Sequence, residues 1–137
     1  MPILSNRSKS KLSTVDLRLQ KVLKAVIDVY DFTVLDGYRS EEMQNKAYKS
    51  GKSRVKYPNS KHNTFPSKAI DIAPWPIPPN WGNDSWKDMV KFYEMAAIVL
   101  YEAAKQGVSV RWGGDWDGDG DYKDNKFDDL VHFEIGE

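Results

Sequence analysis

The stretch Asp129-Leu130-Val131-His132-Phe133-Glu134-Ile135, close to the end of the 137-residue chain, indicates the fold and the chemistry together. Side chains on a β-strand alternate between the two faces of a sheet. The alternating apolar side chains from Val131 to Ile135 therefore share a face that should pack on the core, and His132 and Glu134 share the other face. This alternation predicts a half-buried strand whose second face carries polar side chains.

A second stretch, Ala69-Ile70-Asp71-Ile72-Ala73, has the same alternation. Its isoleucines point to one face and Asp71 points to the other, between alanines that leave room for an ion and a substrate. A carboxylate within an apolar strand needs a partner, because burying an unpaired charge is costly. Two such strands would bring Asp71 and His132 together, and His62 would arrive from the preceding loop.

His62, Asp71 and His132 make a candidate zinc site. Two neutral imidazoles and one carboxylate are typical ligands of a catalytic zinc, which keeps its fourth position for water. The chain has two histidines and no cysteine, so thiolate ligands and disulfides are excluded. The alternative is that the histidines are structural. Glu134 has two open roles, as an acceptor that orients His132 or as a solvated strand residue.

Length and composition favour one globular domain. A chain of 137 residues with 40% hydrophobic and 29% charged residues is ordinary for a globular protein. Basic and acidic residues number 20 each, which argues against a nucleic-acid binder that works through bulk charge. No apolar run has the length of a signal peptide or a membrane span, so we expect synthesis in a cytoplasm.

Helical and strand patterns alternate along the chain and predict an α+β fold, with a small antiparallel sheet packed with about three helices. We expect a loosely ordered N-terminus over residues 1–12 and a single domain over residues 13–137. The expected helices span residues 14–30, 40–50 and 85–106, and the expected strands span 32–35, 69–73, 108–112 and 130–135. The last helix should bury a stripe formed by Met89, Phe92 or Tyr93, Ala96, Leu100, Ala103 and Ala104.

The order of these motifs resembles a family of zinc peptidases. Ser60-x-His62, Ala69-x-Asp71 and Asp129-x-x-His132-x-Glu134 are similar to motifs of D-alanyl-D-alanine carboxypeptidases, vancomycin-resistance dipeptidases and phage L-alanyl-D-glutamate endolysins. Gly37-Tyr38-Arg39-Ser40, followed by Gln44, looks like the early motif of the same family. The resemblance covers nearly the whole chain. The short length and the lack of a signal, anchor or wall-binding domain look most like the phage endolysin branch.

By this resemblance, His62, Asp71 and His132 bind zinc. Asp129 matches the general base, which takes a proton from the attacking water. The metal would polarise the peptide carbonyl and stabilise the developing oxyanion.

The resemblance also implies roles for three polar residues. Arg39 matches a position that steadies a substrate carboxylate or transition-state charge, with a structural salt bridge as the alternative. Ser60 and Gln44 are candidate substrate-binding residues, and shaping the loop is the alternative for Ser60. Eight residues separate His62 from Asp71, a longer gap than is common in the family. A longer loop there would reshape the substrate cleft without moving the ligands.

The implied activity is hydrolysis of the peptide stem of peptidoglycan, first of all at the L-alanyl-D-glutamate bond. A D-alanyl-D-alanine carboxypeptidase or dipeptidase is the second possibility, and a non-catalytic, calcium-stabilised cell-wall-binding module is a third. We expect a monomer that is made in the host cytoplasm and acts in the periplasm or at the cell wall. It would need a membrane-permeabilising partner to arrive there. The basic loop from Lys49 to Lys61 either attracts anionic peptidoglycan or is simply solvated.

The acidic stretch from Asp115 to Asp121 resembles the first half of an EF-hand calcium loop. Its acids alternate, and Gly120 stands where the sharp turn is expected. The pattern then departs, because Lys126 occupies the position of the bidentate glutamate. We predict a calcium site that orders the loop leading to Asp129, with a solvated acidic turn as the alternative. The predicted calcium ligands are Asp115, Asp117, Asp119 and Asp121.

Overall fold

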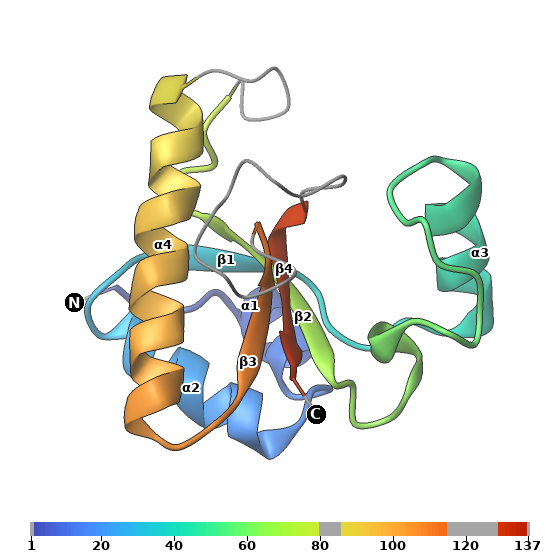
Figure 1. The fold of residues 1–137 in the computed structure, drawn as a ribbon, viewed down its shortest axis with the longest axis horizontal. Coiled ribbons are helices and arrows are strands. Elements are labelled where there is room, and N and C mark those ends of the chain that lie inside the picture. Colours follow the sequence, from blue (N-terminus) through green and yellow to red (C-terminus); the bar gives the residue numbers. More distant parts are fainter. Residues whose placement is uncertain (1, 80–85, 115–128, 137) are drawn as a thin grey trace.

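The computed structural model describes residues 2–79, 86–114 and 129–136. Within them, a four-stranded antiparallel sheet has the order β1-β2-β4-β3, which confirms the predicted α+β fold (Figure 1). The strands are β1 (Phe32–Asp36), β2 (Ala69–Pro74), β3 (Val110–Gly113) and β4 (Asp129–Ile135). The helices are α1 (Asn6–Leu12), α2 (Leu17–Ile27), α3 (Glu41–Lys49) and α4 (Trp86–Lys105), with a 3-10 turn η1 (Lys61–Asn63).

Helices α2 and α4 pack against each other and share one apolar core with the sheet. The apolar residues of α2 recur with a 3–4 spacing and are buried, at Leu19, Val22, Leu23, Val26 and Ile27. In α4 the buried residues are Phe92, Met95, Ala96, Val99 and Ala103. Met89 and Leu100 are partly buried and pack against the core, whereas Ala104 is exposed, so the predicted stripe is wrong at Ala104. Residues 95–100 of α4 are all apolar, so periodicity does not single out one face of the helix there. The contacts of α4 with the sheet determine which face is buried.

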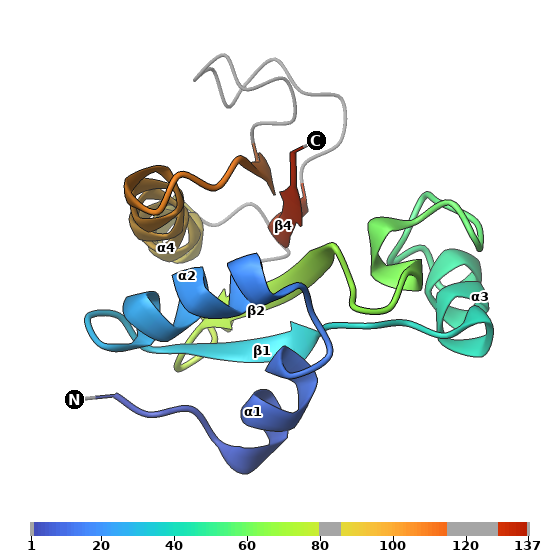
Figure 2. The ribbon, with the colours of Figure 1, turned by 90° about the horizontal axis from the view of Figure 1, so that it is seen from below.

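Helix α1 forms within residues 1–12, where we expected loose order. Ser5 caps it by accepting a hydrogen bond from the backbone N–H of Ser8 at 3.1 Å. The Ser8 hydroxyl in turn accepts from the backbone N–H of Val34, at 3.0 Å, and lies 3.2 Å from the hydroxyl of Thr33. Figure 2 shows α1 on the side of β1 opposite to α2. This short polar helix is therefore stabilised by β1, which local periodicity does not reveal.

Both ends of α3 carry common capping features. Ser40 accepts a hydrogen bond from the backbone N–H of Met43 at the start, and Gly51 adopts a positive φ of 82° just past the end. Asp16 caps α2, which begins later than predicted, at Leu17. None of the described helices combines the length and apolar character needed to cross a bilayer.

Candidate metal centre

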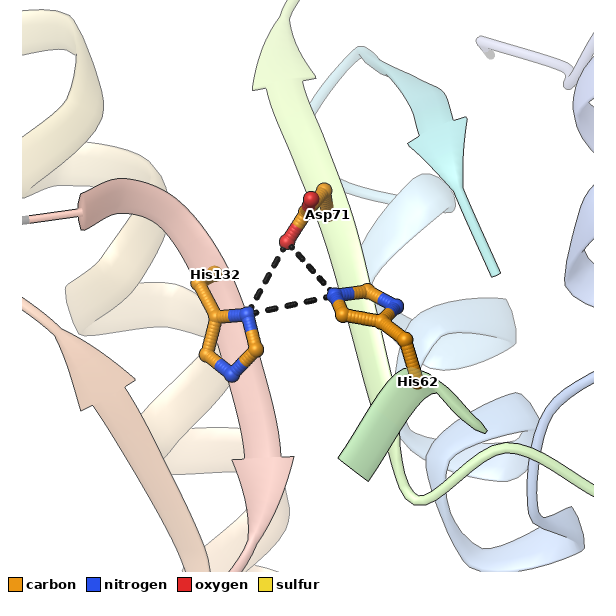
Figure 3. Close-up of side chains that lie close together, drawn as sticks. All are labelled: His62, Asp71 and His132. Atoms are coloured by element: carbon orange, nitrogen blue, oxygen red, sulfur yellow. Dashed lines mark hydrogen bonds and ion pairs between the residues drawn. The ribbon is translucent and has the colours of Figure 1, made fainter. Parts of the chain in front are cut away.

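Three side chains from separate segments converge beside the sheet (Figure 3). Nε2 of His62 lies 3.2 Å from Oδ1 of Asp71 and 3.3 Å from Nδ1 of His132. Nδ1 of His132 lies 3.1 Å from the same Asp71 oxygen. The three residues are 1%, 5% and 8% exposed. The predicted ligands therefore form a compact, buried cluster consistent with a metal site.

Strand pairing and a short turn bring the cluster together. Asp71 on β2 and His132 on β4 are direct cross-strand partners in the antiparallel register. His62 lies on η1, where Ser60 and Asn63 form a reciprocal capping box. The Ser60 hydroxyl accepts from the backbone N–H of His62 at 3.1 Å. Ser60 therefore shapes the turn that carries a ligand, and it also lines the adjacent cleft.

Each member of the cluster is oriented by a second hydrogen bond on its outer side. His62 donates from Nδ1 to the carbonyl of Gly37 at 2.7 Å, and His132 donates from Nε2 to Oε1 of Glu134 at 2.8 Å. Arg39 donates to Oδ2 of Asp71 at 2.8 Å. These contacts direct Nε2 of His62, Nδ1 of His132 and Oδ1 of Asp71 inward, where each can donate a lone pair to a metal that displaces the inner imidazole protons.

The separations and the charge of the cluster suit a divalent cation. A tetrahedral zinc site with bonds of about 2.1 Å has ligand atoms roughly 3.4 Å apart, close to the separations observed. Burial lowers the pKa of His132, but hydrogen bonds to Asp71 and Glu134 outweigh it and raise this pKa to about 9. Burial alone would raise the pKa of Asp71, yet the charge of His62 and the hydrogen bonds from both histidines hold it well below its usual range. The cluster therefore stabilises positive charge at its centre.

Arg39 joins two carboxylates that face each other across the sheet. Asp36 on β1 pairs in register with Asp71, just past an irregularity in the β1 pairing. Arg39 donates from Nε to Oδ2 of Asp36 at 3.1 Å as well as to Asp71, and it is 6% exposed. This is the salt-bridge arrangement that the sequence left as the alternative to a direct role. Because Arg39 also lines the cleft, contact with substrate stays a prediction.

The side chain of Gln44 is buried and forms hydrogen bonds within the protein. It is 0% exposed, accepts from Arg39 at 3.4 Å, and donates to the hydroxyl of Ser53 and the carbonyl of Val55 at 3.0 and 2.7 Å. It is absent from the residues that line the cleft. The structure therefore supports a positioning role for Gln44 in place of the expected contact with substrate.

Glu134 links three elements around His132. While Oε1 accepts from His132, Oε2 pairs with Lys61 at 3.1 Å and with Arg111 of β3 at 3.5 Å. Burial opposes ionisation of Glu134, but the hydrogen bond and charge of His132, with further help from Lys61, lower its pKa to about 2. Glu134 thus orients His132 as a buried carboxylate, which is one of its two predicted roles. Sequence reasoning gave no role to Gly37, although it belongs to the early motif, or to Lys61, which stands between Ser60 and His62.

Asp129 lies at the start of β4 and lines a cleft of about 280 Å³ together with His62, His132 and Glu134. Burial, followed by the negative charge of Asp71, raises the pKa of Asp129 to about 6. A carboxyl group with a raised pKa beside a metal cluster is suited to accepting a proton near neutral pH.

The predicted calcium ligands Asp115, Asp117, Asp119 and Asp121 lie outside the described residues.

The segment between η1 and β2 is a loop, in which Ser67 exchanges backbone hydrogen bonds with Thr14 and Asp16 at 2.9 and 2.8 Å. The long gap is therefore accommodated against the turn between α1 and α2, with both ligands still in the cluster.

A buried carboxylate and two imidazoles beside an open cleft are consistent with the site of a metal-dependent hydrolase. The family model for phage L-alanyl-D-glutamate peptidases matches residues 2–135. The chain belongs to this family and is an enzyme of this class, so a wall-binding module without turnover is not supported.

One relative agrees with this assignment, and one solved structure shares the fold. The L-alanyl-D-glutamate peptidase of Escherichia phage T5 is 33% identical over 120 residues, which cover 85% of this chain and 83% of that protein. The crystal structure of the Serratia marcescens L-Ala D-Glu endopeptidase ChiX aligns over 97% of this chain and 90% of that chain, with a TM-score of 0.70. At 24% identity, that similarity shows a shared fold.

Proposed function

We propose that the protein is a zinc peptidase that hydrolyses the L-alanyl-D-glutamate bond in the peptide stem of peptidoglycan. The observation that carries this proposal is the convergence of Nε2 of His62, Oδ1 of Asp71 and Nδ1 of His132 within 3.3 Å of one another. The family and the phage T5 relative support the choice of bond over the D-alanyl-D-alanine alternative.

His62, Asp71 and His132 would hold the metal, because binding displaces the inner imidazole protons and leaves two nitrogens and one carboxylate oxygen of the kind that zinc prefers. When bound there, zinc supplies Lewis acidity, which polarises a carbonyl and lowers the pKa of water. Gly37, Arg39 and Glu134 keep the three ligands oriented. A buried carboxylate that bonds to the outer nitrogen of a ligating imidazole also makes that imidazole a stronger donor.

Asp129 is the proposed general base. It lines the same cleft as the two histidines, and its raised pKa makes its carboxylate a better proton acceptor than an exposed aspartate. The carboxylate accepts the proton of the attacking water and, once protonated, can deliver that proton to the amine that leaves. The cleft walls exclude part of the solvent, which strengthens the electrostatic interactions of Asp129 with the water and with the leaving amine.

The test combines metal analysis with mass spectrometry of digested peptidoglycan. We expect about one zinc per chain and a new amino terminus on D-glutamate. Release of D-alanine with no such terminus would overturn the choice of bond. In Asp129→Asn, turnover should fall by about 10²–10⁴-fold while zinc is retained. Full activity of that variant would refute Asp129 as the base, and His132→Ala, which loses zinc, is the matched control.

A calcium site at Asp115, Asp117, Asp119 and Asp121 stays a prediction from the alternating acids. Such a site would order the approach to Asp129, so selective removal of calcium should lower turnover while zinc remains bound. Unchanged turnover in calcium-free protein would contradict it. That the protein is monomeric and depends on a membrane-permeabilising partner also stays a prediction.

A further inference from the structure

One wall of the cleft beside the metal cluster is basic. Lys52 and Arg54, on the segment that follows α3 in Figure 1, line this wall, and both residues are exposed. Arg39, Lys61, Asp129 and Glu134 line the same cleft close to the histidines, where Arg39 pairs with Asp71 and Lys61 pairs with Glu134. The cleft therefore has mixed, paired charges at the cluster and two exposed cations on the segment after α3.

The basic wall is connected to the metal cluster by hydrogen bonds. Asp71 accepts from Arg39, and Arg39 donates to Gln44, which is fully buried. Gln44 then donates to Ser53 and Val55, the residues that flank Arg54. The backbone of Ser53 also donates to the carbonyl of Ala47 in α3 at 3.0 Å. This chain of contacts gives the exposed cations a defined position relative to the metal ligands.

We propose that Lys52 and Arg54 form a carboxylate-binding subsite for the D-glutamate residue next to the scissile bond. This inference rests on the proposed function. A glutamate that is joined through its amine and through one carboxyl group keeps a second carboxyl group, which is ionised at neutral pH. A guanidinium and an ammonium are suitable partners for such a carboxylate. The other cations of the cleft, Arg39 and Lys61, are already paired with carboxylates of the protein, which favours Lys52 and Arg54 as the partners of a substrate carboxylate.

The subsite predicts a specific substrate preference. Two stem peptides would be compared that differ only in whether this glutamate carries a free carboxylate or a primary amide. Wild-type protein should cleave the carboxylate peptide with about 10-fold higher kcat/KM, since exposed charge-assisted contacts are partly screened. The variant K52M/R54M should lose most of this preference through KM and should keep its activity on the amide peptide.

A matched control removes the same kind of charge outside the cleft. Lys49 is exposed on α3 and does not line the cleft, so K49M should keep the full preference. Zinc affinity should be unchanged in K52M/R54M, which separates substrate recognition from damage to the cluster. High salt should reduce the wild-type preference.

The outcomes that would contradict the subsite differ in whether the peptidase assignment survives. Equal cleavage of both peptides by the wild-type protein overturns the subsite and leaves the peptidase assignment standing. An equal loss of activity on both peptides in K52M/R54M, or loss of the preference in K49M, also overturns it. Failure of the zinc-loaded wild-type protein to cleave either peptide overturns the proposed function and the subsite together.

Discussion

Replacing Glu134 should weaken zinc binding without unfolding the protein. Glu134 accepts the 2.8 Å hydrogen bond that holds the outer nitrogen of His132, and it is 8% exposed. A hydrogen bond to a charged group contributes about 1.5–3 kcal/mol, and loss of such an outer partner typically lowers metal affinity about 10–100-fold. We expect Glu134→Ala to raise the zinc Kd by roughly 10–100-fold. Glu134→Gln should raise it by about 10-fold, because the amide oxygen still accepts but the charge is lost.

Zinc affinity can be measured by competition with a chromogenic chelator, with circular dichroism as a check on the fold. Glu94→Gln is the matched control, because Glu94 is exposed on α4 and pairs only loosely with Lys91, at 3.9 Å. Its zinc affinity should equal that of the wild-type protein. Wild-type affinity in both Glu134 variants, with the fold intact, would refute the role of this carboxylate in orienting His132.

Three further predictions concern the surroundings of the cluster. The kcat/KM should fall as the pH drops below about 6, because Asp129, whose pKa is raised to about 6, must be ionised to accept a proton. The charge of bound zinc shifts this fall in kcat/KM to lower pH, so a fall that begins above neutral pH would contradict the assignment. Lys61→Met should weaken zinc binding in chelator competition, since Lys61 ties the turn before His62 to Glu134 at 3.1 Å and to the carbonyl of Ile135; unchanged affinity would argue against this tie. Gly37→Ala should lower the free energy of unfolding by about 1–3 kcal/mol, because a Cβ there collides with Thr14 and with the carbonyl of Lys11; unchanged stability in denaturant unfolding would show that the turn yields.

The central part of the site is predictable because strand alternation is a local property. Asp71 and His132 each stand opposite an apolar face in their own strands, which is enough to place both on one side of a sheet. The direct pairing of these two residues in the structure follows from the register. By contrast, the partners of Arg39 depend on the irregular pairing that aligns Asp36 with Asp71, and no local pattern reveals that alignment.

The elements that sequence patterns missed are stabilised by contacts between distant segments. Helix α1 has seven residues and no apolar stripe, and its contacts with Thr33 and Val34 lie 25 and 26 positions along the chain. Lys61 was counted among the residues of a basic loop, whereas its side chain reaches the backbone of Ile135, 74 positions away. Such roles follow from tertiary structure and not from composition.

The cluster also bears on how the protein withstands unfolding. Its histidines are 70 positions apart in sequence, and the chain contains no cysteine. A metal bound by both would act as a removable cross-link that closes a very long loop, as a disulfide does in proteins that contain cysteine. The melting temperature should therefore rise when zinc is added and fall when zinc is removed.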